Sequence, residues 1–281
     1  MIKKAINSLS TIHYPLSTTD HPLIDLHTHI IPGLDDGAKD LDQALAMAEV
    51  AVKDGKTILV ATPHVISGVF DNTKSQILHA VKELNQLLAS EKIPLQILPG
   101  AEYHLEPDLS RRLADGELLT INDTGRYLMV ELPSMIVPHY TGRILYDLQL
   151  QGITPIIAHP ERNIGFAREP ELLQDFVARG ILAQITAGSI TGLFGKPARK
   201  TALRFLKEGY AHLIASDAHS DHGRPPILSL ACKELEHLGG SDCAQTLTYQ
   251  NPRLIIEGLP VEPCIPPKSE SLWTKFLKKS R

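Results

Sequence analysis

The sequence has few cysteines, no long apolar run and no excess of basic residues among its 281 positions. Its three cysteines, Cys232, Cys243 and Cys264, all lie in the last fifth of the chain. Their odd number and their clustering exclude a disulfide framework and favour a reducing compartment. No apolar run approaches the roughly 18 residues of a membrane span, and no signal-peptide core follows the first four residues. We therefore expect a cytoplasmic protein.

The charge balance argues against a nucleic-acid partner. The 28 lysines and arginines are outnumbered by 32 aspartates and glutamates, which gives a net charge of −4. A protein that binds phosphate backbones needs a basic surface, and the chain as a whole predicts none. With 43% hydrophobic residues, a chain of this length can bury a substantial core, and we expect one domain.

Short apolar strands alternate with helical segments from Leu23 onward. Asp40 predicts the start of a helix that ends before Gly55, and Asn72 or Thr73 predicts the start of the next. Further helical segments are expected near 141–151, 170–179 and 197–208. Strands are expected at 25–29, 57–61, 95–98, 127–130, 154–158, 181–185 and 211–215. These seven strand-then-helix units predict an α/β domain with a parallel sheet and crossover helices.

The two ends of the chain differ from this regular part. Residues 1–22 are rich in Ser, Thr and Pro and are interpreted as an N-terminal extension, so the domain is expected to span 23–260. Residues 261–281 form a basic tail in which four large apolar side chains fall at helical spacing, namely Leu272, Trp273, Phe276 and Leu277. Such a tail could make peripheral contact with an anionic membrane, although a frayed or domain-packed terminus is the interpretation that we favour.

Six of the seven strand ends carry histidine or an acidic residue. In Asp25-Leu26-His27-Thr28-His29, the two-residue period of a strand points both histidines to one side. This triplet alone is a weak signal, because a chain with 13 histidines contains one by chance about half the time. In parallel barrels, however, the carboxyl ends of the strands converge on one mouth. The set expected to gather there is His27, His29, Asp36, His64, Glu102, Glu131, His159, Asp217 and His219.

These nine side chains offer nitrogen and oxygen ligands and no thiolate. Such a set suits manganese, iron(II), cobalt or zinc, and it argues against a structural zinc site. Nine ligands are too many for one ion, so we predict two or three ions that clamp a phosphate and activate water. Arg162 and Arg224 each lie a few residues beyond a predicted ligand, and each guanidinium can donate two N–H groups to phosphate oxygens. A surface salt bridge would be the ordinary interpretation of either arginine alone.

Six ordered motifs connect these residues to a known family. They are Asp25–His29 with Asp35-Asp36-Gly37, Thr62-Pro63-His64, Gly100-Ala101-Glu102, Glu131-Leu132-Pro133, Ala158–Arg162, and Ala215–His219 with Gly223–Pro226. With them the chain resembles the PHP (polymerase and histidinol phosphatase) superfamily, and within it the bacterial tyrosine phosphatases of the CpsB/YwqE type. The resemblance implies a distorted (βα)7 barrel of PHP type with the metal site at the C-terminal ends of the strands.

The resemblance also implies a ligand assignment and a substrate. The first ion would be held by His27, His29, Glu102 and Asp217, the second by Glu102, Glu131 and His159, and the third by Asp36, His64 and His219, with manganese the common metal. Arg162 and Arg224 match phosphate-binding positions of that branch and are the predicted catalytic residues. The substrate would be a tyrosine-phosphorylated protein, in particular a membrane-associated tyrosine autokinase of capsule or exopolysaccharide synthesis. A metal-activated hydroxide would hydrolyse its phosphomonoester.

The same residues exclude one alternative activity and leave two others open. A cysteine nucleophile is excluded, because no cysteine is followed by an arginine six residues later. A small-molecule phosphatase of the histidinol-phosphate kind and a non-hydrolytic, nuclease-associated module of the same superfamily both stay open. The sequence identifies no general acid, although a phenol leaving group, with a pKa near 10, needs one less than an alkyl alcohol does.

Overall fold

The structure is a computed structural model of the chain, and it describes residue 19 and residues 21–261. The predicted basic tail beyond Val261 and nearly all of the predicted N-terminal extension lie outside the described residues. Among the residues that are described, no helix combines the length and the apolar character needed to cross a bilayer.

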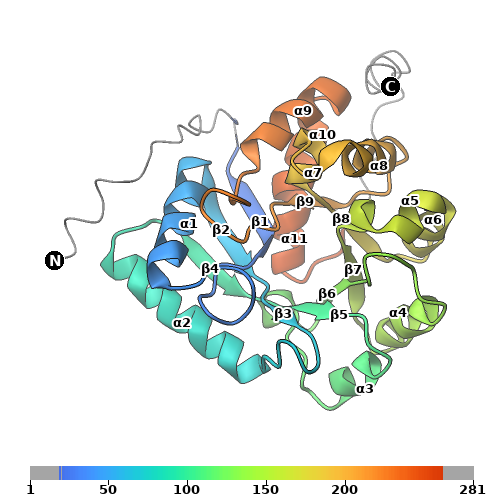
Figure 1. The fold of residues 1–281 in the computed structure, drawn as a ribbon, viewed down its shortest axis with the longest axis horizontal. Helices are drawn as coiled ribbons and strands as arrows, with labels where there is room; N and C mark the ends of the chain where they lie inside the picture. Colours follow the sequence, from blue (N-terminus) through green and yellow to red (C-terminus); the bar gives the residue numbers. More distant parts are fainter. Residues whose placement is uncertain (1–18, 20, 262–281) are drawn as a thin grey trace.

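The described strands pair only in parallel, so the predicted α/β class is confirmed (Figure 1). One sheet has the order β1-β2-β4 and the other has the order β3-β5-β6-β7-β8-β9. The first sheet consists of β1 (Leu23–Thr28), β2 (Lys56–Ala61) and β4 (Gln96–Pro99). The second consists of β3 (His64–Val65), β5 (Glu102–His104), β6 (Tyr127–Glu131), β7 (Thr154–Ala158), β8 (Leu182–Thr186) and β9 (Leu213–Ala215).

Nine strands replace the seven expected, because two short strands that were not predicted, β3 and β5, follow β2 and β4 after brief interruptions. Thr62 and Pro63 separate β2 from β3, and Gly100 and Ala101 separate β4 from β5. Proline has no N–H to donate to a ladder, and a Cβ at Gly100 would lie 2.9 Å from the Val60 side chain. Each interruption therefore lies where the local sequence opposes continuous pairing.

The edge strands β1 and β9 are also linked by hydrogen bonds. The backbone N–H of His29 donates to the oxygen of Ala218 at 2.8 Å, and that of Asp217 donates to the oxygen of His27 at 2.9 Å. Thr28 and Ala218 form a parallel bridge at the same place. These contacts bring the segment after β9, which carries Asp217, directly beside the end of β1.

Helices flank the strands on several sides (Figure 1). The longer helices are α1 (Leu41–Lys53), α2 (Lys74–Ser90), α4 (Thr141–Leu150), α6 (Pro170–Ala178), α8 (Gly195–Lys207) and α9 (Ser229–Gly239). The shorter ones are α3 (Leu109–Ala114), α5 (Ile164–Arg168), α7 (Ala187–Thr191), α10 (Ser241–Gln245) and α11 (Asn251–Ile256). Asp40 caps α1 by accepting from the N–H of Gln43 at 2.9 Å, and Thr73 caps α2 in a reciprocal pair with Gln76.

The core explains why the strand sequences are almost continuously apolar. β1, β8 and β9 are buried at every position, because helices or other strands cover both faces. The apolar face of α2, with Ile77, Val81 and Leu84, packs into the same core. Several buried histidines and acids, among them His29, Glu102 and Asp217, lie at or beside strand ends, where they need polar partners or ions.

Candidate active site

The first pair of predicted ligands lies at the end of β1. His27 is in the strand and His29 follows it, and both side chains are fully buried. Their Nε2 atoms lie 3.2 Å apart, so the two rings face one point as the strand period predicts. The loop that follows folds back onto His29, because Ala38 donates its N–H to the His29 backbone oxygen at 3.0 Å.

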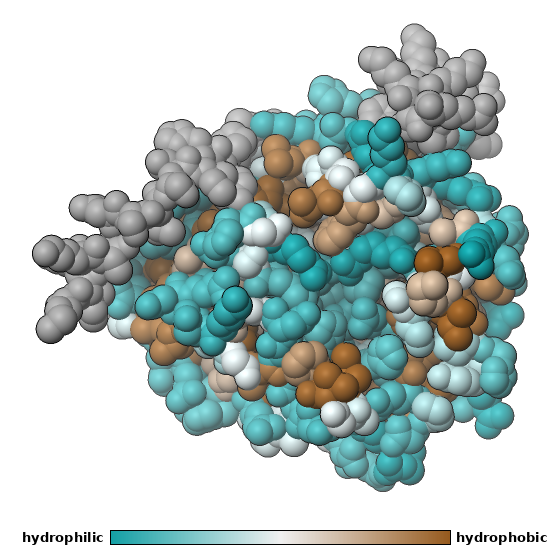
Figure 2. All heavy atoms as spheres, in the orientation of Figure 1, coloured by the Kyte–Doolittle hydropathy of each residue, from teal (hydrophilic) through white to brown (hydrophobic). Residues whose placement is uncertain are grey.

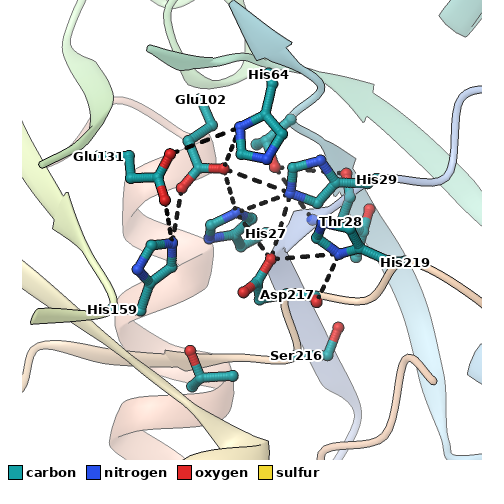
Figure 3. A network of polar contacts seen from close by, with 12 residues as sticks. His27, Thr28, His29, His64, Glu102, Glu131, His159, Ser216, Asp217 and His219 are labelled. Carbon is teal, nitrogen blue, oxygen red and sulfur yellow. Dashed lines mark hydrogen bonds and ion pairs between the residues drawn. The ribbon is translucent and has the colours of Figure 1, made fainter. Parts of the chain in front are cut away.

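Glu102, the first residue of β5, lies at the centre of the site (Figure 3). Its buried carboxylate lies 3.1 Å from Nε2 of His27, 2.9 Å from Nε2 of His159 and 3.1 Å from Nδ1 of His64. Burial alone would raise the pKa of Glu102, but the charge of His27 and the hydrogen bond with His159 outweigh it and hold the pKa well below its usual range. The central carboxylate is therefore ionised.

Asp217 faces two different groups with its two oxygens. Oδ1 lies 3.4 Å from Nε2 of His27 and 3.3 Å from Nε2 of His29. Oδ2 accepts hydrogen bonds from both Arg162 and Arg224, the latter at 2.7 Å. Burial alone would raise the pKa of Asp217, but the charges of His27 and Arg162 outweigh it and hold the pKa well below its usual value. One carboxylate thus connects the histidine cluster to the arginine pair.

Two site residues adopt a backbone conformation that side chains other than glycine rarely take. His159 has φ of 36° and Asp217 has φ of 53°, both in the left-handed region. Such residues cost of order 1–3 kcal/mol and persist where the surrounding structure determines them. At both positions the conformation turns the chain sharply as it leaves the strand and directs the side chain toward Glu102 or His27.

The outer members of the set lie toward the opening. Asp36 is 56% exposed, with Oδ1 3.3 Å from Nε2 of His219 and 3.6 Å from Nε2 of His64. The hydrogen bond with His219 lowers the pKa of Asp36 to about 2. Glu131 is more loosely placed, because its nearest predicted partner, Nε2 of His159, is 3.7 Å away. All nine predicted ligands therefore lie in one neighbourhood.

Four groups of these side chains place ligand atoms within 4.8 Å of one another. They are His29, Asp36, His64 and His219; His27, His29 and Asp217; His27, Glu102 and His159; and His64, Glu102 and Glu131. These groups overlap with the three sets implied by the resemblance but divide the residues differently, since Glu131 here accompanies His64. The assignment of each ligand to a particular ion stays a prediction.

The donor set fits bound cations on two observations. Oε2 of Glu102 and Nδ1 of His64 are buried 3.1 Å apart, and neither has a hydrogen-bond partner among the described residues. Unsatisfied buried polar atoms are costly, and a cation bound by both atoms would satisfy them. In addition, Nδ1 of His27 and of His29 is occupied by outer partners, which leaves both Nε2 atoms directed at the centre.

Neither of those outer partners, Asp35 and Gln184, was predicted as a site residue from the sequence. Oδ2 of Asp35 lies 2.6 Å from Nδ1 of His29, and Oε1 of Gln184 lies 2.9 Å from Nδ1 of His27. Asp35 also accepts the backbone N–H of His64 at 2.9 Å. A signal was present for both, because Asp35 is next to Asp36 and Gln184 is a polar residue inside an apolar strand.

Arg162 and Arg224 border an open cavity of about 340 Å³. Ligand candidates from five strand ends line the same cavity, namely Asp36, His64, Glu131, His159, Asp217 and His219. The two arginines and the candidate metal ligands therefore line the same cavity. Such a hollow can bind a small anion between guanidinium groups and cations.

Comparison with known proteins places the chain in a family. Residues 23–257 match the family described as capsular polysaccharide synthesis, CpsB/CapC. Tyrosine-protein phosphatase YwqE of Bacillus subtilis (strain 168) is 39% identical over 256 residues, covering 90% of this chain and 100% of YwqE. Tyrosine-protein phosphatase CpsB of Streptococcus pneumoniae is 30% identical over 242 residues, covering 83% of this chain and 98% of CpsB.

Solved structures agree with this match. One chain from the crystal structures of YwqE and CpsB, which are described as unique metal-dependent tyrosine phosphatases, aligns with a TM-score of 0.83 at 38% identity. The alignment covers 87% of this chain and 98% of that chain. A histidinol phosphate phosphatase from Lactococcus lactis aligns with a TM-score of 0.51 at 13% identity, covering 85% of this chain and 98% of that chain, which shows a shared fold alone. By sequence and by structure, this chain belongs to the CpsB/CapC family of capsular polysaccharide synthesis.

Proposed function

We propose that this protein is a metal-dependent protein-tyrosine phosphatase that hydrolyses the phosphomonoester of tyrosine-phosphorylated proteins. The observation that carries the proposal is the position of Asp217. One of its carboxylate oxygens faces two histidines, and the other accepts hydrogen bonds from Arg162 and Arg224. The relatives YwqE and CpsB, whose names describe this activity, extend over most of the chain.

The proposal includes a fold and a domain. We propose a distorted (βα)7 barrel of PHP type over residues 23–260, in which β2 with β3 and β4 with β5 each count as one interrupted strand. The hydrogen bonds between the ends of β1 and β9 support closure of the ring. On this reading the metal site lies at the C-terminal ends of the strands, where parallel barrels carry their chemistry.

The nine ligands would hold three ions, with Glu102 shared between the first and second. We keep the assignment implied by the resemblance: His27, His29, Glu102 and Asp217 for the first ion, Glu102, Glu131 and His159 for the second, and Asp36, His64 and His219 for the third. Manganese suits these ligands, and iron, cobalt and zinc would also bind them. When bound, such ions supply Lewis acidity toward phosphate oxygens and lower the pKa of water.

The arginines would act on the substrate itself. Each guanidinium already donates to a carboxylate oxygen of Asp217, which has the charge and planarity of the anions that arginine forks bind. A phosphoryl group in the cavity would accept from the same N–H donors, so both arginines would orient it and spread the charge that develops on its equatorial oxygens. Arg162 and Arg224 are thus the proposed catalytic and phosphate-binding residues.

The proposed partner is a tyrosine-phosphorylated protein, in particular a membrane-associated tyrosine autokinase of capsule or exopolysaccharide synthesis. The family description supports a role in capsular polysaccharide synthesis. Cytoplasmic residence and membrane contact through the tail stay predictions from the sequence, and the tail lies outside the described residues. Loss of liposome binding on deletion of residues 266–281 would support the membrane contact, and unchanged binding would refute it.

Turnover by the manganese-loaded protein tests the substrate class. The protein is assayed with a tyrosine-phosphorylated peptide and with histidinol phosphate at equal concentrations, and we expect a clear preference for the peptide. A preference for histidinol phosphate would replace the proposal with a small-molecule phosphatase. Absence of turnover together with salt-sensitive binding of single-stranded DNA would replace it with a nuclease-associated module.

A further inference from the structure

Phe194 lies against both proposed phosphate-binding arginines. Its ring centroid is 4.8 Å from Cζ of Arg162 and 5.5 Å from Cζ of Arg224. It is half-buried in the connection between α7 and α8. We propose that Phe194 is a positioning residue, an aromatic platform that holds the two guanidinium groups over the phosphate site. This inference rests on the proposed function and adds a residue to it.

The ring has a fixed place because a glycine makes room for it. A Cβ added at Gly188 would lie 2.7 Å from Cε2 and 3.1 Å from Cδ2 of Phe194, so the ring occupies the space that a side chain there would fill. Gly192 and Gly195, with φ of 93° and 85°, bracket the segment, and both conformations suit glycine. The backbone N–H of Leu193 donates to the oxygen of Gly188 at 2.7 Å and closes the turn.

The ring also lines a further cavity beside each arginine. Phe194 lines one cavity together with Arg224 and a second cavity together with Arg162. The two guanidinium groups converge on the same oxygen of Asp217, so two like charges lie close together at the site. The negative face of an aromatic ring stabilises a nearby guanidinium, which offsets part of this repulsion.

A platform of this kind suits anion binding better than another carboxylate would. The ring has no lone-pair acceptor, so it leaves the guanidinium N–H donors available to a phosphate. An additional acid would compete with the phosphate for those donors and would repel it. Phe194 therefore limits the conformational freedom of two long side chains without neutralising them, which lowers the entropy lost on binding.

Binding of inorganic phosphate to the manganese-loaded full chain tests the inference without relying on turnover. Phe194→Leu removes the ring, and we expect its dissociation constant for phosphate, measured by calorimetry, to rise about threefold to thirtyfold. Phe194→Tyr keeps the ring and should stay within about twofold of wild type. Leu193→Ala, which changes a 57% exposed neighbour in the same turn, is the matched control and should leave phosphate binding unchanged.

Coupling to an arginine separates positioning from a general structural role. In an Arg162→Met background, Phe194→Leu should have a smaller effect than in wild type, whereas independent roles would give additive losses. Metal content and melting temperature are measured on every variant. If Phe194→Leu does not fold, Gly188→Ala provides a second displacement of the ring, and it should weaken phosphate binding as well.

Three outcomes would overturn the inference. They are wild-type phosphate affinity in folded Phe194→Leu, an equal loss in Phe194→Leu and Phe194→Tyr, and additive losses in the Arg162→Met background. A wild-type protein that binds phosphate but does not hydrolyse phosphotyrosine would contradict the proposed function alone. The phosphate measurements would still decide the role of Phe194, so the two failures are distinguishable.

Discussion

Arg224 donates a 2.7 Å hydrogen bond from Nη2 to Oδ2 of Asp217, while the other oxygen of that carboxylate faces His27 and His29. This contact joins the part of the site that suits cations to the part that suits an anion. Because both arginines share the same oxygen, the arrangement of the anion-binding part depends on Asp217 as well as on the arginines.

Replacing Arg224 by lysine should impair turnover although the charge is kept. A lysine cannot present two parallel N–H donors to a phosphate, so we expect kcat/KM for a phosphotyrosyl peptide to fall by about 100-fold. Arg143→Lys is the control, since Arg143 is 79% exposed and pairs with Asp147 on α4. Unimpaired turnover in Arg224→Lys would remove Arg224 from the proposed machinery.

Asp35 should control metal affinity although it is no proposed ligand. Asp35→Asn weakens the 2.6 Å contact that fixes the His29 ring, and outer partners of this kind are worth about 10- to 100-fold in metal affinity. Metal titration of the stripped protein measures the effect. Asp147→Asn, at a residue of α4 that pairs with the exposed Arg143, serves as the control. Equal metal affinity in wild type and Asp35→Asn would show that Asp35 does not orient a ligand.

Gly37 should tolerate no side chain. A Cβ there would lie 2.1 Å from the backbone oxygen and 2.4 Å from Cβ of His29, so Gly37→Ala must displace a proposed ligand. We expect lost metal binding and a marked fall in melting temperature. Gly33→Ala, in the same loop, has φ of +74° and nothing within 4 Å, so it should cost only about 1–2 kcal/mol of conformational strain. Similar behaviour of the two variants would contradict this explanation.

The strands could be predicted because a strand that is buried on both faces consists of an almost continuous run of apolar residues. β7 was expected at 154–158 and spans Thr154–Ala158, and Asp40 and Thr73 fixed the helix starts through local capping. The short strands β3 and β5, which follow Pro63 and Gly100, were missed, since they depend on pairing with distant neighbours. Local signals therefore located the elements but not the division into two sheets.

A topological rule predicts that the site residues lie together, but it does not predict the contacts that hold them in place. Strand ends meet at one rim in a parallel fold, so distant histidines and acids could be collected from sequence. The contacts of Gln184 with His27 and of Phe194 with the arginines join segments that no periodicity relates. Their identification needed the three-dimensional arrangement of β8 and the α7–α8 connection.

His212 should make folding stability depend on pH. Burial lowers its pKa to about 4, and its Nδ1 accepts the N–H of Ala183 at 3.1 Å, so the folded protein keeps the ring neutral. The unfolded chain, with a histidine pKa near 6.5, binds more protons between pH 4 and 6.5. The stability that His212 contributes is complete above about pH 6.5 and is about 2 kcal/mol lower at pH 5.

His212→Asn isolates this contribution. Asparagine keeps an acceptor near the position of Nδ1 and does not titrate, so its free energy of unfolding should fall less between pH 7 and pH 5 than that of wild type. Urea unfolding at both pH values gives the difference, and loss of metal in acid affects both proteins alike. Parallel pH dependence in the two proteins would show that His212 does not titrate as described.

Metal removal tests the central proposal most directly, namely that the gathered histidines and acids form an ion site required for phosphate hydrolysis. Purified protein is analysed for bound metal, stripped with a chelator and assayed on a phosphotyrosyl peptide before and after addition of manganese. We predict bound metal in the purified protein, no turnover after stripping, and recovery with manganese. Undiminished turnover by protein shown to be free of metal would contradict the account.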